Sequence, residues 1–338
     1  MWIKRKPDWN LPESAVTSPE AFRQRRQILK TMAAGPLVAA GSTLWPGAAR
    51  ADYGPPDGDP THDLYPVERN PAFTVERTKT EREVAATYTN YYEFGSSKTI
   101  WPRAQDMEIR PWTVRIDGMV EEERDIDIDD LIRRMALEER IYRLRCVEAW
   151  SMVIPWSGFP LKDLVDLARP LSGAKYLRME TFHDPDVARG QRASWYPWPY
   201  VEGLTMAEAR NELAFMGTGM YGEPMPQQNG SPLRLVAPWK YGFKSIKGIV
   251  RITFTGERPA TFWEALAPDE YGFWANVNPR VNHPRWSQAS EKVLQSTSDI
   301  GIFSRPEEVA TQPFNGYGEY VADLYAGLEE EYGDRLYR

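Results

Sequence analysis

Strand-like and helix-like segments follow one another along this 338-residue chain without a regular β-α-β rhythm. From Trp112 to Met119 apolar and polar residues alternate, which predicts a half-buried strand. An apolar stripe that starts at Ile128 predicts a helix, with Asp127 or Asp129 as its cap. A doubly wound sheet needs strands and helices in regular alternation, so this irregular order favours an α+β domain.

Three further segments complete the expected elements. Residues 143–147 predict a strand that carries a cysteine near its end, and residues 205–216 predict a helix. Residues 320–328 predict a helix that docks at the end of the chain. The sequence contains no internal repeat and no glycine-rich dinucleotide or P-loop fingerprint, so nucleotide-binding folds of these kinds are not indicated.

The N-terminal 51 residues are typical of an export signal. A basic leader with the pair Arg25-Arg26 precedes a weakly polar stretch, and Ala49-Arg50-Ala51 has the small-x-small pattern of a cleavage site. Paired arginines of this kind direct folded proteins across the bacterial inner membrane by the twin-arginine route, which predicts a periplasmic protein. The alternative is a basic amphipathic helix that stays attached. Residues 52–86 predict an extended segment that wraps the surface, and residues 87–338 a single domain.

The charge distribution excludes one class of partner. The whole chain carries a net charge of −7, and residues 1–51 contribute +5, so residues 52–338 carry −12. A strongly acidic protein repels the phosphate backbone, and nucleic acid is therefore not expected as a partner.

Cys146 is the only cysteine of the chain. Cationic groups lower the pKa of a thiol, so the nearby Arg143 and Arg145 would favour the thiolate, which is the form that binds a soft transition metal. A buried structural cysteine is the alternative. The three histidines show no metal-binding spacing, so a zinc site is not expected.

Two loops are candidate anion sites. Residues 226–236 hold an asparagine, a glycine and Arg234, which could clamp a phosphate, although an ordinary ordered turn has the same composition. Residues 239–247 combine three lysines with aromatic residues and glycine, and the alternative there is a basic surface loop. A soft ligand and two anion-binding loops in one chain suit a phosphorylated organic cofactor that carries a metal.

The 13 tryptophans are the other unusual feature of the composition. Such side chains could form a hydrophobic mouth around a site, for which Trp150, Trp156 and Trp195 are the candidates, or they could simply fill the core.

The chain resembles the MsrP (YedY) family, the molybdoenzyme subunit of bacterial periplasmic protein-methionine-sulfoxide reductase. The resemblance covers nearly the whole chain from Asn90 onward, and RRQILK at 25–30 matches as well. The stretches that carry it are NYYEFG (90–95), LEERIYRLRCVEAWSMVIPWSGFPL (137–161), WPYVEGL (198–204), PQQNGSPLRLVAPWKYGFKSIK (226–247) and APDEYGFWANVNPRVNHPRWSQA (267–289). It implies a sulfite-oxidase-like molybdopterin-binding fold, an α+β domain with mixed β-sheets and surrounding helices.

The resemblance also implies a site. Cys146 would ligate the molybdenum of a Mo-molybdopterin cofactor. Thr89 stands where the family motif has an asparagine. The residues that would contact the pterin or hold its loop are Thr89, Asn90, Tyr92, Glu93, Thr181, Asn229, Arg234, Ser245, Ile246 and Lys247.

Glu148 is a candidate from its position rather than from the resemblance. Two residues past Cys146 in a strand, it would point to the same face and could donate a proton near the metal. The alternative is a salt bridge with Arg143 or Arg145.

The activity that the resemblance implies is reduction of methionine sulfoxide in oxidised periplasmic proteins by oxygen-atom transfer. The electrons would come from a haem-containing integral membrane subunit (MsrQ) and the quinone pool, with the chain as a monomer in a heterodimer with that subunit. One rival is a small-molecule S-oxide or N-oxide reductase or a sulfite oxidase of the same fold. Another is a cofactor-free periplasmic binding protein that uses its tryptophans for a ligand.

Overall fold

β1 (Thr113–Gly118) forms where the alternating pattern predicts a strand, with Val114 and Ile116 buried. In the computed structural model, which describes residues 53–301 and 304–338, β1 pairs in parallel with β10 and antiparallel with β2. The five-stranded sheet has the order β2-β1-β10-β5-β6. Its other strands are β2 (Arg124–Asp127), β5 (Tyr176–Thr181), β6 (Val201–Thr205) and β10 (Ile249–Thr255).

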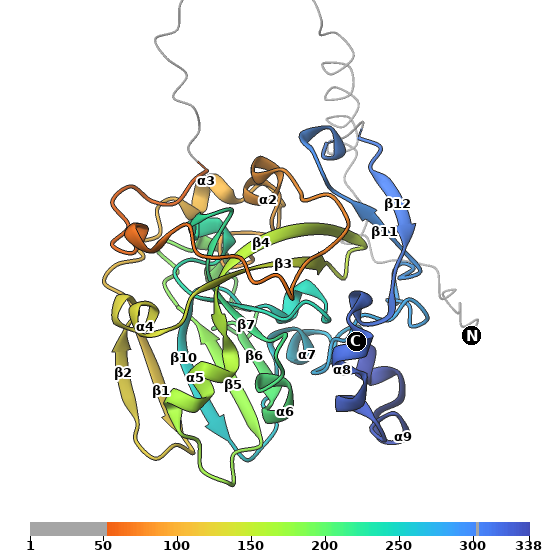
Figure 1. Ribbon diagram of the computed structural model, residues 1–338. Helices are drawn as coiled ribbons and strands as arrows, with labels where there is room; N and C mark the ends of the chain where they lie inside the picture. The colour runs from red at the N-terminus through yellow and green to blue at the C-terminus, as the bar shows by residue number, and fades with distance from the viewer. Residues whose placement is uncertain (1–52, 302–303) are drawn as a thin grey trace, which may run out of the picture. The chain divides into compact units, whose positions relative to one another are not determined.

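A second sheet of seven strands is built around β4 (Trp150–Pro160), which is buried at every position except its last. β4 pairs antiparallel with β3 and β7 and parallel with β11, so this sheet is mixed like the first (Figure 1). The remaining strands are β3 (Glu138–Arg145), β7 (Phe215–Met220), β8 (Glu223–Pro224), β9 (Arg234–Val236), β11 (Ser290–Val293) and β12 (Glu307–Ala310).

The helices are short and surround the two sheets (Figure 1). α4 (Ile128–Arg134) begins as predicted, because the Asp127 carboxylate accepts hydrogen bonds from two backbone N–H groups of its first turn. The other helices are α2 (Arg82–Thr87), α3 (Trp101–Ala104), α5 (Leu161–Ala168), α6 (Met206–Ala209), α7 (Phe262–Leu266), α8 (Gly318–Val321) and α9 (Glu329–Tyr332).

The helix predicted over residues 205–216 is wrong for most of its length. Only α6 forms, and the chain then turns, with the Asn211 side chain accepting a hydrogen bond from the Leu213 N–H at 2.9 Å. From Phe215 the chain enters β7, where all six residues are buried between β4 and β9. Pairing on both sides outweighs the helical propensity of this segment.

The helix predicted over residues 320–328 is also broken. α8 ends at Val321, whose backbone (φ −132°, ψ −15°) leaves the helical region, and a 3-10 turn, η8 (Ala322–Tyr325), follows. The segment still docks as expected, because the buried Tyr325 hydroxyl donates to the Glu208 carboxylate at 2.6 Å.

Residues 53–81 contain only one 3-10 turn, η2 (His62–Leu64), and α2 then begins inside the range predicted to be extended. The segment is tied to the second sheet by backbone hydrogen bonds, for example from Thr80 N–H to the Val153 carbonyl at 2.9 Å. The predicted export signal, residues 1–51, lies outside the described residues. Within residues 53–301 and 304–338, we find no helix with the length and hydropathy that a membrane span requires.

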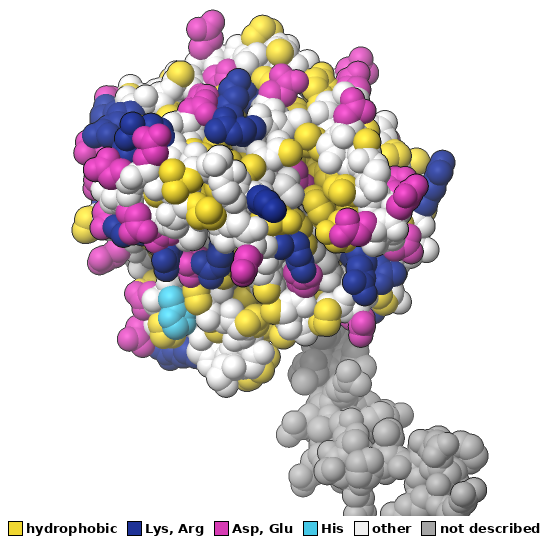
Figure 2. Space-filling view, turned by 90° about the horizontal axis from the view of Figure 1, so that it is seen from below, with side chains coloured by type: hydrophobic (Ala, Val, Ile, Leu, Met, Phe, Trp, Pro, Cys, Tyr) yellow, Lys and Arg dark blue, Asp and Glu magenta, His cyan; other side chains and the backbone are white. Residues whose placement is uncertain are grey.

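On the face shown in Figure 2, acidic and basic side chains are interspersed.

Candidate active site

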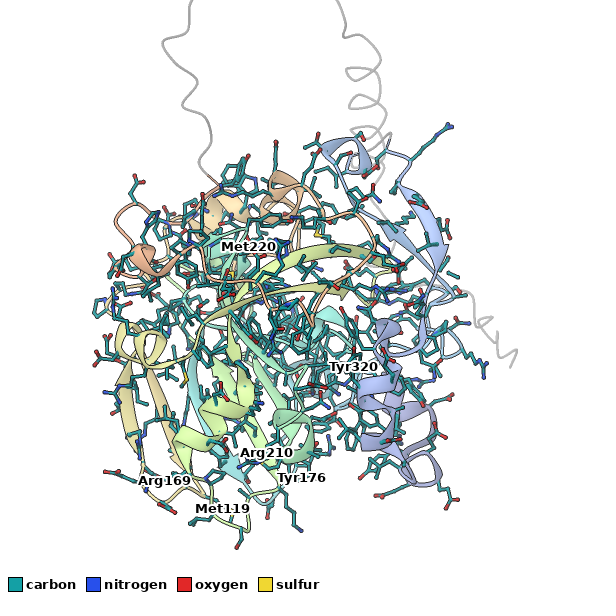
Figure 3. All side chains as sticks on the ribbon, in the orientation of Figure 1. Met119, Arg169, Tyr176, Arg210, Met220 and Tyr320 are labelled. Atoms are coloured by element: carbon teal, nitrogen blue, oxygen red, sulfur yellow. The ribbon has the colours of Figure 1, made fainter. Side chains whose placement is uncertain are left out.

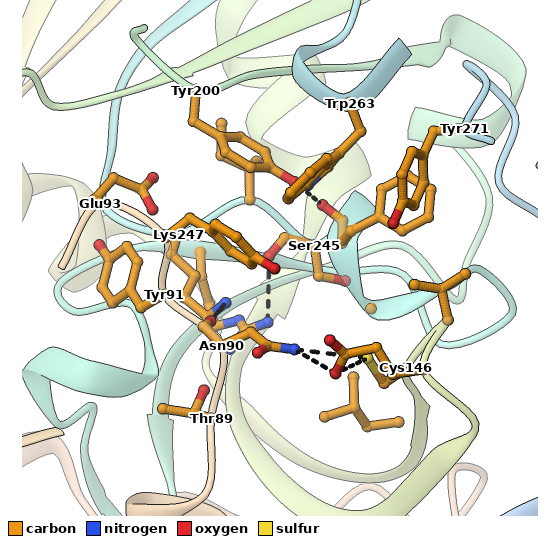
Figure 4. A pocket seen from close by; sticks show the side chains of 18 of the residues that line it. Thr89, Asn90, Tyr91, Glu93, Cys146, Tyr200, Ser245, Lys247, Trp263 and Tyr271 are labelled. Carbon is orange, nitrogen blue, oxygen red and sulfur yellow. Dashed lines mark hydrogen bonds between the residues drawn. The ribbon is translucent and has the colours of Figure 1, made fainter. Parts of the chain in front are cut away.

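A cleft of about 820 Å³, measured with the solvent at its mouth, brings together segments that are far apart in the sequence (Figure 4). One side is formed by the turn between β3 and β4, another by residues 89–93 after α2, and a third by residues 242–247 before β10. The lining residues are Thr89, Asn90, Tyr91, Tyr92, Glu93, Leu144, Cys146, Val147, Glu148, Trp150, Tyr200, Arg234, Gly242, Phe243, Ser245, Ile246, Lys247, Trp263 and Tyr271.

Cys146 lies in a tight turn directly after β3. Its carbonyl accepts a hydrogen bond from the Ala149 N–H at 3.1 Å, and its N–H donates to the Trp150 carbonyl at 2.9 Å. Ala149 adopts a positive φ of 63°, which reverses the chain into β4. The hairpin between two paired strands therefore fixes the thiol at the cleft, where the residue is 6% exposed.

The charge of Arg145 lowers the pKa of the thiol as expected, but burial outweighs it, and the thiolate is not favoured. Arg145 turns into the second sheet, where its guanidinium pairs with Glu291 at 3.0 Å, and Arg143 donates to Gln312 at 2.7 Å. Burial, together with the charge of Glu148, raises the pKa of the Cys146 thiol to about 12. The free thiol is therefore protonated at neutral pH, and a metal that binds it must displace a proton.

Glu148 lies beside the thiol, with its Oε2 3.6 Å from Cys146 Sγ. The turn, and not a strand as predicted, brings them together. Its ion-pair partner is Lys98, at 2.6 Å, rather than Arg143 or Arg145. Burial alone would raise the pKa of Glu148, but the hydrogen bond and charge of Lys98 hold it below its usual range. Asn90 Nδ2 donates to the same carboxylate at 3.2 Å and lies 3.7 Å from Cys146 Sγ.

Two buried basic residues, Arg234 and Lys247, also line the cleft. Arg234 donates to the backbone carbonyls of Asn229 at 2.8 Å and Ser245 at 3.3 Å, and Lys247 Nζ donates to the Asn90 carbonyl at 2.8 Å. Neither cation forms an ion pair with a carboxylate in the part of the chain that the structure describes. Burial lowers the pKa of Arg234 to about 10, so the guanidinium stays charged at neutral pH.

Several buried polar atoms near these cations have no hydrogen-bond partner among the described residues. They are Asn90 Oδ1, Tyr91 OH and Asn229 Oδ1. Burial, with the charge of Arg234, lowers the pKa of Lys247 to about 7, and burial raises the pKa of Glu93 to about 7. The charged Arg234 guanidinium and the unsatisfied polar atoms in a buried cleft favour an anionic ligand with several polar groups.

Comparison with known proteins assigns the family. The family model described as "Oxidoreductase molybdopterin binding domain" matches residues 101–263 of this chain. The protein-methionine-sulfoxide reductase catalytic subunit MsrP of Xanthomonas axonopodis pv. citri is 46% identical over 321 residues, covering 95% of this chain and 96% of that protein. The catalytic subunit MsrP of Burkholderia mallei is 44% identical over 95% of this chain and 94% of that protein. The chain belongs to the MsrP family.

Among solved structures, the sulfane dehydrogenase SoxCD from Paracoccus pantotrophus aligns with a TM-score of 0.46 and 17% identity, over 77% of this chain and 67% of that chain. Membership of the MsrP family makes the chain an oxidoreductase with a molybdopterin-binding domain. The predicted α+β fold with mixed sheets is confirmed.

The site residues that the MsrP resemblance implied are brought to one cleft, with two exceptions. Thr181 and Asn229 lie behind its lining. The Thr181 hydroxyl donates to the Lys247 carbonyl at 2.7 Å, and the Asn229 carbonyl accepts from Arg234. Thr181 therefore holds the backbone of Lys247, and Asn229 holds the side chain of Arg234, while a direct contact of either with a cofactor stays a prediction.

Only one of the three lysines in residues 239–247 lines the cleft of this MsrP family member, so the expectation of an anion site built from all three is wrong. Lys240 pairs with Glu208 at 2.5 Å, and Lys244 pairs with Glu202 at 2.9 Å. All four side chains are at most 1% exposed. These pairs anchor the loop to β6 and α6 and leave Lys247 to face the cleft.

Replacing Lys240 with methionine should lower the free energy of unfolding by about 3–5 kcal/mol, because Glu208 would be left as an unpaired buried charge. Denaturant titration measures this. The double variant Lys240→Met/Glu208→Leu should recover part of the loss, since both charges are then removed. A change below about 1 kcal/mol in the single variant would contradict the pairing.

The three tryptophans proposed as a mouth occupy different places. Trp150 lines the cleft, Trp156 is buried beneath Arg234 with its ring 4.7 Å from the guanidinium, and Trp195 is on the surface. The aromatic residues on the side of the cleft above Cys146 in Figure 4 are instead Tyr200, Trp263 and Tyr271. These three residues and Lys98 are not predictable as site residues from the sequence, because no local pattern connects them with Cys146.

Proposed function

We propose that this chain reduces methionine sulfoxide in oxidised proteins to methionine, at a molybdenum that Cys146 ligates as part of a bound molybdopterin. The names of the relatives, protein-methionine-sulfoxide reductase catalytic subunits, support the substrate. The observation that carries the proposal is that one cleft brings together a single thiol and the basic side chains of Arg234 and Lys247, neither of which forms an ion pair with a carboxylate of the described residues.

The residues of the cleft fit such a cofactor. A thiolate is a ligand that molybdenum accepts as a soft donor, and Arg234 and Lys247 would hold the pterin phosphate. Tyr91 OH and Asn90 Oδ1, for which residues 53–301 and 304–338 offer no hydrogen-bond partner, are placed to bind polar groups of the pterin. Ser245 and Ile246 also line the cleft, and the Ser245 carbonyl accepts a hydrogen bond from Arg234 at 3.3 Å.

The net reaction converts a sulfoxide, two electrons and two protons into a thioether and water. When bound, the cofactor supplies oxygen-atom transfer and two-electron redox chemistry. The protein orients the substrate and excludes water. Trp263 and Tyr271 offer an apolar wall for the methylene and methyl groups of the side chain, and Asn90 orients the Glu148 carboxylate next to the thiol.

The electrons must come from a partner, because a chain with one cysteine cannot hold an iron–sulfur cluster by four thiolates. The relatives are named catalytic subunits, which supports a second subunit. We propose a haem-containing integral membrane subunit that draws on the quinone pool, with the chain exported folded to the periplasm by the twin-arginine route. A heterodimer of one copy of this chain with one copy of that subunit would be enough to deliver the electrons.

The test compares two reactions of the purified, cofactor-loaded enzyme. With a small-molecule reductant, the enzyme should reduce methionine sulfoxide in an oxidised protein, and with an artificial acceptor it should not oxidise sulfite at a comparable kcat/KM. The reverse preference would favour a sulfite oxidase. Activity on small S-oxides or N-oxides without activity on protein-bound methionine sulfoxide would favour a small-molecule reductase.

Glu148 remains the candidate for proton transfer, and because Lys98 holds the pKa of its carboxyl group below its usual range, the carboxylate would take up a proton before it delivers one. A Glu148→Gln variant should lose about 100-fold in turnover if the carboxyl group delivers a proton, because general acid–base groups contribute about 10²–10⁴-fold. A Lys98→Met variant, which removes the ion pair and keeps the carboxyl group, serves as the control. Unchanged turnover and an unchanged pH profile in Glu148→Gln would remove Glu148 from the mechanism.

A further inference from the structure

Trp195 is the most exposed large hydrophobic side chain among residues 53–301 and 304–338, with 73% of its surface accessible. The other two of this kind, Leu171 and Tyr320, are 47% and 40% exposed. Single exposed apolar residues are ordinary on protein surfaces, whereas connected ones mark interaction sites. The neighbours of Trp195 therefore decide whether it has a function.

Aromatic side chains connect Trp195 with the rim of the cleft. The ring centroids of Trp195 and Tyr196 are 5.9 Å apart, and the Tyr196 ring lies 6.4 Å from Tyr92 and 6.5 Å from Trp263. Tyr92 and Trp263 both line the cleft, and their rings are in edge contact at 4.8 Å. These four residues form a continuous aromatic ridge from the candidate active site to the surface.

The loop that carries Trp195 is fixed before any ligand binds. The Tyr196 N–H donates to the Ala193 carbonyl at 3.1 Å. Upstream, the Gly190 N–H donates to the Glu93 carbonyl at 2.7 Å, which ties the loop to the segment that lines the cleft. An aromatic side chain held in this way binds a partner with little loss of conformational entropy.

The ridge offers aromatic surface rather than charge. The nearest cation along the chain, Arg192, donates to Asp186 at 3.1 Å and to the Pro185 carbonyl at 2.7 Å. Indole and phenol rings bind apolar side chains and thioethers well and select little by charge. The chemistry therefore fits an extended polypeptide with apolar side chains.

We propose that the aromatic ridge binds the polypeptide on one side of the oxidised methionine, with Trp195 packing against an apolar side chain of the substrate. This inference rests on the proposed function. Trp195 is two ring contacts away from the cleft lining, so residues that flank the methionine, and not the methionine itself, would touch it. The ridge would make the enzyme prefer polypeptides over the free amino acid.

The experiment uses the holoenzyme, a small-molecule reductant and two substrates. One substrate is a short unstructured peptide with a central methionine sulfoxide between apolar residues, and the other is free methionine sulfoxide. In Trp195→Ala, kcat/KM for the peptide should fall about tenfold, mainly through KM, because buried tryptophans dominate binding at interfaces. The value for free methionine sulfoxide should stay at the wild-type level.

Tyr320→Ala is the matched control. Tyr320 is an exposed aromatic residue of α8, labelled in Figure 3, and it is not part of the cleft lining. Both substrates should keep their wild-type values in this variant. Calorimetric binding of the peptide to the same proteins gives a second readout that does not depend on turnover, and Trp195→Ala should weaken binding by the same factor.

Three results would overturn the inference. They are an equal loss for both substrates, no loss for the peptide, and peptide binding that Trp195→Ala leaves unchanged. A defect that arises only with the membrane electron donor, or a loss of binding to lipid vesicles with unchanged peptide kinetics, would reassign Trp195 to another partner. If the wild-type enzyme reduces neither substrate, the proposed function fails, whereas the binding readout still decides the role of the ridge.

Discussion

Replacing Cys146 with serine should lower turnover at least about 100-fold and remove most of the molybdenum from the purified protein. Loss of groups that only support a metal ligand already costs about 10–100-fold in affinity or activity, and here the ligand itself is lost. The thiol is the only one in the chain, so no other cysteine can take its place. Metal analysis and steady-state kinetics on the same preparation measure both effects.

The fold should survive this change. A serine hydroxyl at position 146 keeps the hydrogen-bond partners Asn90 and Glu148 and occupies less volume than the thiol. We expect the free energy of unfolding of the cofactor-free protein to change by no more than about 1–2 kcal/mol. A Cys146→Ser variant that keeps wild-type molybdenum and turnover would contradict the ligand assignment while leaving the fold assignment intact.

Replacing Arg234 with glutamine should prevent stable retention of the pterin. The guanidinium is 3% exposed and has no carboxylate partner in the described residues, so it is free to pair with a phosphate. Removing one partner of a buried charge pair costs about 2–5 kcal/mol, which is at least about a 30-fold loss of affinity. The pterin released on denaturation, measured per chain after gel filtration, reports this loss.

Arg140 offers the matched control for Arg234. It is also a buried arginine, 4% exposed, but it lies between the rings of Phe73 and Phe215 and pairs with Glu138, away from the cleft. Arg140→Gln should destabilise the protein and leave the pterin content near one per chain. Equal pterin loss in both variants would show that Arg234 acts through general stability, and Arg234→Lys should retain part of the pterin because the charge remains.

Local sequence signals predicted local structure well. The alternation of residues 112–119 gives β1, and Asp127 caps α4, because both depend on neighbours within a few residues. The helix over residues 205–216 failed because β7 is stabilised by pairing with β4 and β9, which lie far away in the sequence. A short stretch of sequence around β7 does not show which strands it pairs with.

In the candidate site, too, the contacts between residues far apart in the sequence were not predicted. Family resemblance assigned Cys146, Arg234 and Lys247, which share one cleft. Residue-level reasoning gave the wrong partner for Glu148, since Lys98 approaches it from 50 positions away. Arg143 and Arg145 point away from the thiol, toward Gln312 and Glu291, because both lie on β3, and the antiparallel pairing of β3 with β4 decides which way their side chains face.

The ratio of molybdenum and pterin to protein tests the central claim most directly. Protein purified from a molybdenum-replete host should contain close to one molybdenum and one pterin per chain, and removal of the cofactor should abolish reduction of methionine sulfoxide. Protein that contains neither molybdenum nor pterin, or that reduces methionine sulfoxide equally well without them, would contradict the account.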